Sequence, residues 1–332
     1  METSLTDSHP IPQILPVEHA EQDRPFWSVM IPTYNARFDF LKESLESILV
    51  QGHGPERMQI EVVDDCSTVN DVVEMVHRIA GERISVSKTP QNLGLAGCWN
   101  LCIEKSRGHW VHILHQDDSV LPGFYDRYES AISKHSDIAL IASRSFLIDG
   151  QGIINNITQR IVSLENCSND ASGLYYYCSV QCPSVVVKRC AYEALGGFRN
   201  DLKYTLDVEM WLRIISEMGG IVLHDILSRY RECKGNESSR LWHGTAALAD
   251  EMHVGNILAG MYADYDLSQA RRIMWKNAMR VAESCAKNND LEVARAIRKY
   301  ARHNLPFGVL LRCEASQILR RIAMLLGLNQ SY

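Results

Sequence analysis

The sequence predicts an α/β fold, in which a mostly parallel sheet is flanked by helices and a helical extension follows at the C-terminal end. Three observations support this prediction. Short apolar runs alternate with amphipathic stretches between residues 27 and 118, several of these runs end in polar residues, and the spacing from residue 241 onward is helical throughout. Strand–helix alternation is typical of parallel strands with helices on the faces of their sheet.

Apolar spacing assigns the elements of the first half. The run at residues 29–31 stops at Pro32 and is typical of a strand, whereas the apolar residues of 38–49 recur at helical spacing until Gly52. The same criteria predict strands at residues 60–63, 84–86 and 110–114 and helices at residues 72–79 and 95–106. The second half is less regular, with strands predicted at residues 138–143, 153–157, 185–187 and 221–223 and a helix at residues 206–218 that ends at Gly219.

Three regions follow from these patterns. Residues 1–24 are polar and proline-dotted and lack the features of a signal peptide, so we interpret them as a flexible lead-in. Residues 25–240 form the α/β domain, and residues 241–332 form the helical extension, which Pro306–Phe307–Gly308 interrupts. No apolar run approaches the roughly 20 residues that cross a bilayer. We therefore expect a soluble protein, or one held at a membrane surface by less than a span.

Composition narrows the class of protein. Of the 332 residues, 34 are Lys or Arg and 40 are Asp or Glu, which gives a formal net charge of -6 and argues against a nucleic-acid binder. The ten cysteines form no Cys-x-x-Cys pair. Zinc sites usually need such doublets, and disulfide scaffolds are usually shorter and denser in cysteine. Reduced thiols in a cytosolic compartment are therefore the favoured interpretation.

Polar residues follow three of the predicted strands. Thr33–Tyr34–Asn35 follow the first strand, Asp64–Asp65 the second, and His115–Gln116–Asp117–Asp118 the fourth. In open α/β sheets, ligands bind just beyond the carboxyl ends of the strands. We therefore expect these three segments to line one crevice.

Asp117–Asp118 is the most informative pair, because two adjacent acids repel each other unless a cation or hydrogen-bond donors intervene. Mg²⁺ and Mn²⁺ bind carboxylate oxygens and take substrate phosphates as further ligands. The alternative is a helix N-cap, because residues 119–124 lead into a helix and acids favour that end. From the pair alone, both interpretations stay open.

Other polar segments are ambiguous by themselves. Asp64–Asp65 could accept a hydrogen bond from a nucleobase, but an ordinary turn before a helix at Val69 is the better interpretation in isolation. Asn92–Leu93–Gly94 could bring backbone close to a ligand, or could simply start a helix. Asp207 and Glu209 lie near a helix start and do not share a helix face, so we expect different roles for them. The alternative is that both are simply acids in the first turn of the helix, where negative charge is favourable.

Three histidines at positions 109, 112 and 115 resemble a metal cluster. On a strand, however, residues three apart face opposite sides of the sheet. A three-histidine zinc site is therefore not expected, and His109 and His112 are interpreted as structural.

Four motifs occur in order at the predicted strand ends: Ile31–Pro32–Thr33–Tyr34–Asn35, Val62–Val63–Asp64–Asp65–Cys66–Ser67, Asn92–Leu93–Gly94 and Leu114–His115–Gln116–Asp117–Asp118. With these motifs the chain resembles glycosyltransferase family 2 over roughly residues 27–240. Members of that family are inverting enzymes with the GT-A fold, a Rossmann-like sheet. The resemblance implies transfer of a sugar from a nucleotide-sugar donor, in which uracil is the usual base, to a hydroxyl of a glycan or lipid-linked acceptor.

The resemblance also implies roles for single residues. Asp117 is the direct ligand of Mg²⁺ or Mn²⁺, Asp207 is the catalytic base, and Asp65 binds the nucleobase. Tyr230–Arg231 resembles a late Tyr-Arg motif near the diphosphate. The implied donor-binding set is Pro32, Thr33, Tyr34, Asn35, Asp65, Asn92, Gly94, His115, Gln116, Asp118 and Arg231.

Three positions depart from the family pattern. His115 stands where an Asp is common, at a position that generally meets ribose, which a His can also do. Leu206 replaces the usual Glu before the base, and Cys233 stands where a His often follows the Tyr-Arg pair. The diphosphate end of the site is the least certain part of the resemblance.

Two other classes of protein remain in view. A sugar nucleotidyltransferase has a related sheet, but it normally opens with a Gly-rich phosphate loop, which residues 32–35 do not provide. A glycan- or nucleotide-binding module without activity is the second alternative.

The C-terminal residues 305–328 mix apolar residues with arginines. They suit a helix that packs on the catalytic domain or in a homodimer, which is favoured, or a helix on a membrane surface. The protein is accordingly expected to be cytoplasmic, with possible peripheral contact at the inner face of the cell membrane.

Overall fold

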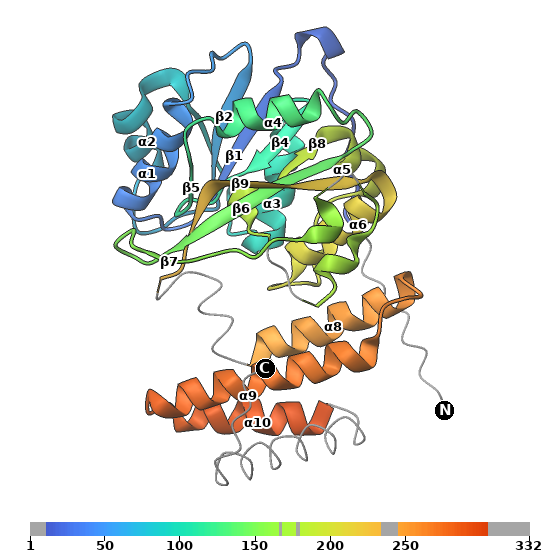
Figure 1. Ribbon diagram of the computed structural model, residues 1–332. Coiled ribbons are helices and arrows are strands. Elements are labelled where there is room, and N and C mark those ends of the chain that lie inside the picture. Colours follow the sequence, from blue (N-terminus) through green and yellow to red (C-terminus); the bar gives the residue numbers. More distant parts are fainter. Residues whose placement is uncertain (1–10, 166–167, 177–179, 234–244, 305–332) are drawn as a thin grey trace. The chain divides into compact units, whose positions relative to one another are not determined.

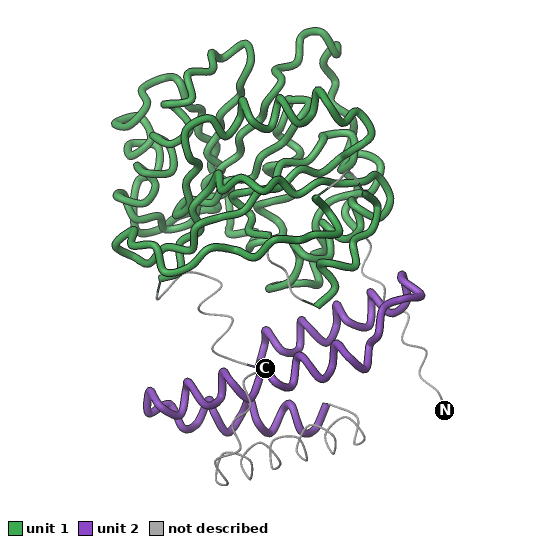
Figure 2. The backbone as a smooth tube through the Cα atoms, viewed as in Figure 1, with its two compact units in different colours: residues 1–233 green, residues 234–332 purple. Residues whose placement is uncertain are grey.

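The computed structural model describes residues 11–165, 168–176, 180–233 and 245–304. The chain divides into two compact units, residues 1–233 and residues 234–332 (Figure 2). The domain boundary expected at residue 240 lies outside the described residues.

Unit 1 is built on one mixed sheet with helices on its faces (Figure 1). Its strands are β1 (Trp27–Thr33), β2 (Met58–Asp64), β3 (Ser85–Lys88), β4 (Trp110–Ile113), β5 (Ser119–Val120), β6 (Leu140–Ile148), β7 (Ile154–Ile157), β8 (Val186–Lys188) and β9 (Gly220–Arg231). The strand order is β3-β2-β1-β4-β8-β6-β9-β5, with β7 beside β6.

The first four strands of the chain are parallel neighbours, as the alternating pattern predicts. Beyond β4 the directions are mixed, because β8 runs antiparallel to β4 and β6, whereas β6 and β9 are parallel. The α/β fold with its flanking helices is thus confirmed, and the purely parallel part is the N-terminal half.

The helices of unit 1 are α1 (Phe38–Leu49), α2 (Val72–Ala80), α3 (Gly94–Lys105), α4 (Phe124–Ile132), α5 (Arg189–Leu195) and α6 (Leu206–Met218). Short 3₁₀ turns lie at Glu21–Asp23, Gly81–Arg83, Val162–Leu164, Ala171–Leu174 and Cys182–Ser184. Local signals explain the ends: Asp71 caps α2 by accepting from Glu74 N–H, and Gly196 and Gly219 follow α5 and α6 with positive φ.

The core lies between the sheet and these helices. Trp27, Val29 and Ile31 of β1 are fully buried, and Leu41 and Leu45 of α1 pack into the same cluster. Burying one such side chain stabilises the fold by about 1.5–3 kcal/mol. This rigid layer fixes where the carboxyl ends of β1, β2 and β4 lie.

Two expectations for the first strands need correction. Pro32 lies inside β1, paired with Val63, rather than ending the strand. It is tolerated there because the pairing of β1 with β4 ends at Met30, so the missing N–H breaks no bond to β4. The segment after Asp118 is β5, paired with β9, and α4 begins only after Gly123, so Asp118 is not a helix N-cap.

Residues 11–16 pack on unit 1, which differs from the flexible lead-in expected for residues 1–24. Ile14 is 1% exposed. The Gly197 N–H donates to the Pro12 carbonyl at 2.7 Å, and Arg189 Nη2 donates to the Leu15 carbonyl at 3.1 Å. This stretch is therefore part of the folded unit.

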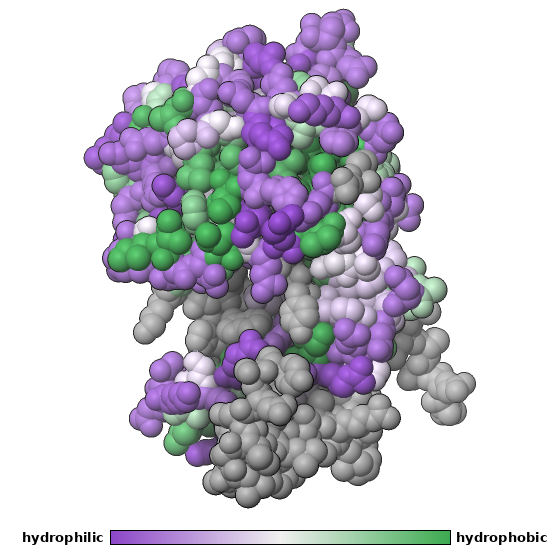
Figure 3. Space-filling model, in the orientation of Figure 1, coloured by the Kyte–Doolittle hydropathy of each residue, from purple (hydrophilic) through white to green (hydrophobic). Residues whose placement is uncertain are grey.

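The surface of unit 1 is mostly hydrophilic, with apolar residues gathered near its middle on the face seen in Figure 3. Elsewhere, the β7 strand exposes large apolar side chains, among them Ile154 and Ile157. Among the described strands, β7 pairs with β6 and thus leaves one edge unpaired.

Unit 2 contains α8 (Thr245–Met261), α9 (Leu267–Lys287) and α10 (Leu291–Asn304), which pack on one another. Ala294, Ile297 and Ala301 recur at helical spacing and form the buried face of α10. None of the helices in the described part of the chain combines the length and apolar character needed to span a membrane. The amphipathic stretch predicted at residues 305–328 lies outside the described residues.

Candidate active site

The ends of β1 and β2 are joined by a polar turn around Asn35. Asn35 adopts a positive φ of 48°, and its Oδ1 accepts from the Thr68 and Val69 N–H groups at 2.9 and 3.1 Å. Its own N–H donates to Ser67 Oγ at 2.8 Å. Asp64 accepts from the Ser67 N–H at 2.9 Å. Of the two acids Asp64 and Asp65, Asp64 is therefore the one that stabilises this turn.

Asp65 turns the other way and binds the start of α3. Its Oδ1 accepts from the Leu93 N–H at 2.7 Å, and its Oδ2 accepts from the Gly94 N–H at 3.0 Å. Asn92 Nδ2 donates to the Asp65 carbonyl at 3.2 Å. Asp65, Asn92 and Gly94 are therefore one connected part of the site, with Asp65 buried and satisfying N–H groups at the helix N-terminus.

Gln116 links the ends of β4 and β1. Its Oε1 accepts from the Tyr34 N–H at 2.9 Å, and its Nε2 donates to the Tyr34 carbonyl at 3.2 Å. The Tyr34 ring is left 46% exposed at this edge, whereas Thr33 is buried and donates to the Ile31 carbonyl. An exposed aromatic side chain held by a fixed backbone can stack on a planar ligand.

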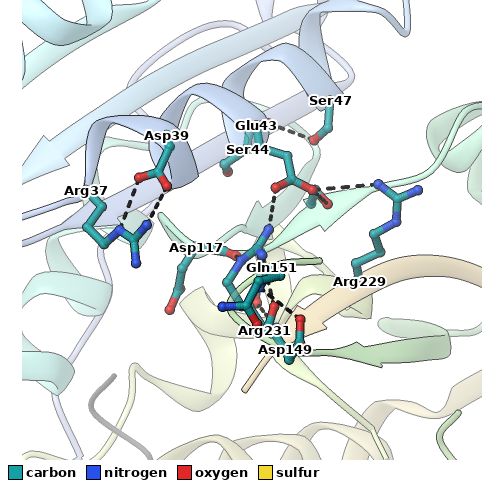
Figure 4. A network of polar contacts seen from close by, with 12 residues as sticks. Arg37, Asp39, Glu43, Ser44, Ser47, Asp117, Asp149, Gln151, Arg229 and Arg231 are labelled. Atoms are coloured by element: carbon teal, nitrogen blue, oxygen red, sulfur yellow. Dashed lines mark hydrogen bonds and ion pairs between the residues drawn. The ribbon is translucent and has the colours of Figure 1, made fainter. Parts of the chain in front are cut away.

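The acidic pair after β4 is held from β9. Arg231 donates its backbone N–H to Asp118 Oδ1 at 2.8 Å and its Nε–H to the Asp117 carbonyl at 2.9 Å. Figure 4 shows the Asp117 side chain pointing away from the Arg231 guanidinium. Asp118 Oδ2 is buried, has no hydrogen-bond partner and lies 3.5 Å from His115 Nδ1.

The electrostatics of this pair are unusual. Burial, and then the charge of Asp118, raise the pKa of Asp117 to about 6. Burial alone would lower the pKa of His115, but its 3.5 Å ion pair with Asp118 and the charges of Asp117 and Asp207 raise that pKa overall. A nearby carboxylate can shift a pKa only over a short range. Asp118 is thus the direct partner of His115, and the charges of Asp117 and Asp207 act on the same ring.

Asp207 lies at the start of α6. Its Oδ1 accepts from the Val208 N–H at 2.8 Å, and its Oδ2 accepts from the thiol of the buried Cys182 at 3.6 Å. Burial raises the pKa of Asp207, while these two hydrogen bonds and His115 act against the rise. A carboxylate with a raised pKa is a better proton acceptor than an ordinary one.

Glu209, two residues further, has a different task, as expected from helical geometry. Its carboxylate accepts from Arg213 Nε and Nη2 at 2.9 and 3.0 Å, and both side chains are buried. Arg213 also donates to the Leu195 and Gly197 carbonyls at 2.6 and 3.0 Å. Glu209 therefore anchors the first turn of α6 through Arg213, whereas Asp207 contacts the Cys182 thiol.

The donor set at this edge suits a hard divalent cation. Asp117 offers a carboxylate that burial and Asp118 destabilise in its ionised form, and the Asp118 Oδ2 atom is buried without a donor. A cation of the Mg²⁺ or Mn²⁺ type would relieve both. Within the described residues, no group of three or more His, Cys, Asp or Glu side chains could hold a metal alone. Such an ion would need further oxygen ligands from the substrate.

The other two histidines of the triplet have structural partners. His112 is buried against Phe124, and its ring nitrogens lie 2.9 Å from Tyr125 Oη and 3.1 Å from the Pro183 carbonyl. Burial lowers its pKa to about 3. The His109 carbonyl accepts from the Arg189 N–H at 2.8 Å.

Three residues that contact the site are not predicted from the sequence. Trp99 of α3 lies against the His115 ring at 4.8 Å between centroids, Cys182 contacts Asp207, and Glu43 of α1 pairs with Arg231. No local motif marks them, because each reaches the site only through packing of distant segments. Burial of a tryptophan or a cysteine is otherwise ordinary.

Comparisons with known proteins show which family this chain is similar to. The profile of "Glycosyl transferase family 2" matches residues 28–173. The putative teichuronic acid biosynthesis glycosyltransferase TuaG of Bacillus subtilis is 25% identical over 228 residues, which cover 66% of this chain and 84% of that protein. An uncharacterized glycosyltransferase of Methanocaldococcus jannaschii is 26% identical over 214 residues, covering 64% of this chain and 72% of that protein.

Solved structures share the fold. S. aureus TarS 1-349 in complex with UDP-GlcNAc has a TM-score of 0.56 at 16% identity and covers 85% of this chain and 93% of that chain. A mannosyltransferase from Pyrobaculum calidifontis in complex with GDP-Man and Mn²⁺ has a TM-score of 0.52 at 16% identity, covering 94% of this chain and 84% of that chain.

Proposed function

This chain belongs to glycosyltransferase family 2, and from that premise we propose that it moves a sugar from a nucleoside-diphosphate donor to an acceptor hydroxyl with inversion at the anomeric carbon. The observation that carries this proposal is the acidic pair after β4, in which the buried Asp118 lies 3.5 Å from His115 and accepts from the Arg231 N–H, together with the carboxylate of Asp207, whose charge acts on the same histidine. Such carboxylates can provide both a cation ligand and a proton acceptor.

Asp207 is the proposed general base. It takes the proton of the acceptor hydroxyl while the hydroxyl oxygen attacks the anomeric carbon and the bond to the diphosphate breaks on the opposite face. Val208 N–H and the Cys182 thiol fix the carboxylate, and burial raises its pKa. Both features favour proton transfer in a single displacement.

Asp117 is the proposed metal ligand, and Asp118 is proposed to support it. A divalent cation, when bound, neutralises charge on the departing diphosphate. The fit of the site to Mg²⁺ or Mn²⁺ supports this assignment, and the related mannosyltransferase fold is known with Mn²⁺.

The donor is proposed to be a UDP-sugar bound across the ends of β1, β2 and β4. Tyr34 presents an exposed ring, and Asp65 Oδ2 accepts one hydrogen bond although a carboxylate oxygen has two lone pairs, so it can still accept from a base N–H. Asn35, Asn92, Gly94 and Gln116 hold these two residues in position. The TarS fold is known with UDP-GlcNAc.

A donor panel tests the proposal against its two alternatives. The purified chain is incubated with Mn²⁺ and with UDP-linked and GDP-linked sugars, and the release of nucleoside diphosphate is measured. We expect slow release of UDP through transfer to water, abolished by EDTA. A sugar nucleotidyltransferase would instead release diphosphate from a nucleoside triphosphate and a sugar phosphate, and a binding module would bind donors without release.

The acceptor is proposed to be a glycan or lipid-linked hydroxyl, reached at the inner face of the cell membrane by a cytoplasmic protein. The charges of the two units support this. Residues 1–233 contain 20 Lys and Arg against 31 Asp and Glu, whereas residues 234–332 contain 14 against 9. Basic side chains of α10 line an open hollow of about 460 Å³: Arg295, Arg298, Lys299, Arg302 and His303. A basic surface of this kind suits anionic lipid headgroups; a homodimer through unit 2 is the competing use of the same helices.

A further inference from the structure

We propose that Arg231 is an internal clamp for the acidic pair rather than a ligand of the donor diphosphate, and that Glu43 of α1 is the positioning residue that keeps it in this role. The proposal deepens the function proposed above, because it concerns the segment that would bind the metal. It rests on the contacts of one buried guanidinium.

Arg231 holds both residues of the acidic pair. Its backbone N–H binds the carboxylate of Asp118 at 2.8 Å, and its side-chain Nε–H binds the carbonyl of Asp117 at 2.9 Å. The first contact fixes the Asp118 carboxylate, and the second fixes the backbone from which the Asp117 carboxylate projects. One residue at the end of β9 therefore sets the geometry of both acids.

The two terminal nitrogens of the guanidinium also bind groups of the protein. Nη1 donates to the Asp149 carbonyl at 3.1 Å, and Nη2 pairs with the carboxylate of Glu43. The Cζ atom lies 4.3 Å from the centroid of the Phe40 ring, and the residue is 2% exposed. Figure 4 shows Arg231 between Glu43 on one side and Asp149 on the other. A phosphate ligand would normally direct its planar fork at the substrate.

Glu43 is the acid that balances the buried charge. Its carboxylate pairs with Nη2 on the side of Arg231 opposite Asp149, so the guanidinium is held between the two. Without Glu43, Asp117 is an acid beside the guanidinium that could pair with it, because its carbonyl already accepts from Nε at 2.9 Å. An arginine paired with Asp117 would compete with a cation for the same oxygens. Residues that orient a metal ligand typically change metal affinity 10–100-fold when removed.

The chain offers a matched control on the same carboxylate. Arg229 Nη1 also approaches Glu43, at 3.7 Å, but its side chain is 42% exposed and it touches neither acid of the pair in the described contacts. Exposed ion pairs of this kind contribute little. Arg229→Gln therefore removes a positive charge near Glu43 while leaving the clamp in place.

The test compares Glu43→Gln, Arg231→Gln, the double variant and Arg229→Gln in the full chain. Mn²⁺ is titrated at a fixed UDP concentration, and UDP is titrated separately in EDTA, both by intrinsic fluorescence. We expect Glu43→Gln and Arg231→Gln each to raise the half-saturating Mn²⁺ concentration about 10–100-fold. The double variant should be no worse than the Arg231 variant, metal-free UDP affinity should stay within about twofold, and excess Mn²⁺ should restore turnover in Glu43→Gln.

A direct phosphate role predicts the opposite pattern and would overturn the proposal. Arg231→Gln would then weaken UDP binding in EDTA about tenfold or more, and Glu43→Gln would leave Mn²⁺ affinity unchanged. Thermal unfolding identifies variants that do not fold. If Arg231→Gln does not fold, the Mn²⁺ affinity of Glu43→Gln alone tests the clamp. We expect that variant to fold, because the Glu43 side chain is 38% exposed and the amide has the same size. If the parent chain shows no Mn²⁺-dependent UDP binding, the proposed function fails, whereas a binding parent with an unaffected Glu43→Gln variant refutes only the clamp.

Discussion

Asp207→Asn is the substitution that tests the catalytic proposal most directly. The amide has nearly the shape of the carboxylate, and its one oxygen can still accept from the Val208 N–H, which lies 2.8 Å from Oδ1. Its NH2 group replaces the oxygen that accepts from the Cys182 thiol at 3.6 Å and can donate to the sulfur instead. What the variant loses is the ability to take a proton. Binding of donor and metal should therefore survive, and turnover should fall.

The size of the loss follows from general-base catalysis. A positioned base contributes about 10²–10⁴-fold, which corresponds to about 2.7–5.4 kcal/mol in the activation free energy. The free energy of unfolding of Asp207→Asn, in contrast, should not fall. Because burial raises the pKa of Asp207, its contribution to stability is present below the unfolded pKa and is lost as the pH rises through the folded pKa. At neutral pH the Asn variant is thus expected to be at least as stable as the parent.

The assay is release of nucleoside diphosphate at saturating Mn²⁺ and donor, measured across pH together with thermal unfolding. In the parent, the rate should rise with pH through the raised pKa of Asp207, because only the ionised carboxylate accepts a proton. In Asp207→Asn this acidic limb should disappear. A variant that keeps turnover within about threefold of the parent, or keeps the same pH limb, would show that Asp207 is not the base.

Four further predictions use other parts of the chain. Asp117→Ala should abolish Mn²⁺-dependent strengthening of UDP binding in calorimetry, and unchanged metal dependence would exclude Asp117 as the ligand. Glu209→Ala should cost about 3–5 kcal/mol of unfolding free energy in a urea titration, because it leaves the buried guanidinium of Arg213 unpaired, and a loss under about 1 kcal/mol would contradict the anchoring role. Cys182→Ala should raise the pH of the acidic limb, because a hydrogen bond that lowers the pKa of Asp207 is removed, and an unmoved limb would speak against that contact. Neutralising the four Lys and Arg charges of α10 should lower the partition coefficient onto vesicles that contain 30% phosphatidylglycerol by about 1,000-fold in co-sedimentation, because each charge is worth about 1 kcal/mol, whereas equal binding of the parent to neutral vesicles would refute an electrostatic contact.

Much of the framework could be predicted from local patterns. The helix over Leu206–Met218 was predicted within its observed bounds, because its apolar spacing and the glycines that follow it are properties of a short segment. The strand predicted at residues 221–223 is much shorter than the observed β9, which ends at Arg231. The missing part contains charged and polar residues that pair with β6 and β5. Pairing of that kind depends on a neighbouring strand rather than on the hydropathy of the strand itself.

The sequence predicts which residues belong to the site, but it does not predict which groups they contact. Asp65 was assigned to the nucleobase, yet in the fold it also accepts from the Leu93 and Gly94 N–H groups, 28 and 29 positions further along the chain. Arg231 was assigned to the diphosphate, yet its donors meet Asp117, Asp149 and Glu43. Hydrogen-bond partners of buried groups are chosen by packing, because every buried donor must find an acceptor that the final fold brings near.

The sequence by itself determined the order of strands and helices as far as β4, the acids at the strand ends and the resemblance to a sugar-transferring family, because periodicity and short motifs depend on neighbouring residues. Only the tertiary structure decided that Asp118 pairs with His115, that the arginine balanced by Glu43 lies 188 positions away from it along the chain, and that a cysteine thiol binds Asp207. The physical reason is that charges and hydrogen bonds act through space over a few ångströms, and such distances exist only once the sheet has brought its strand ends together.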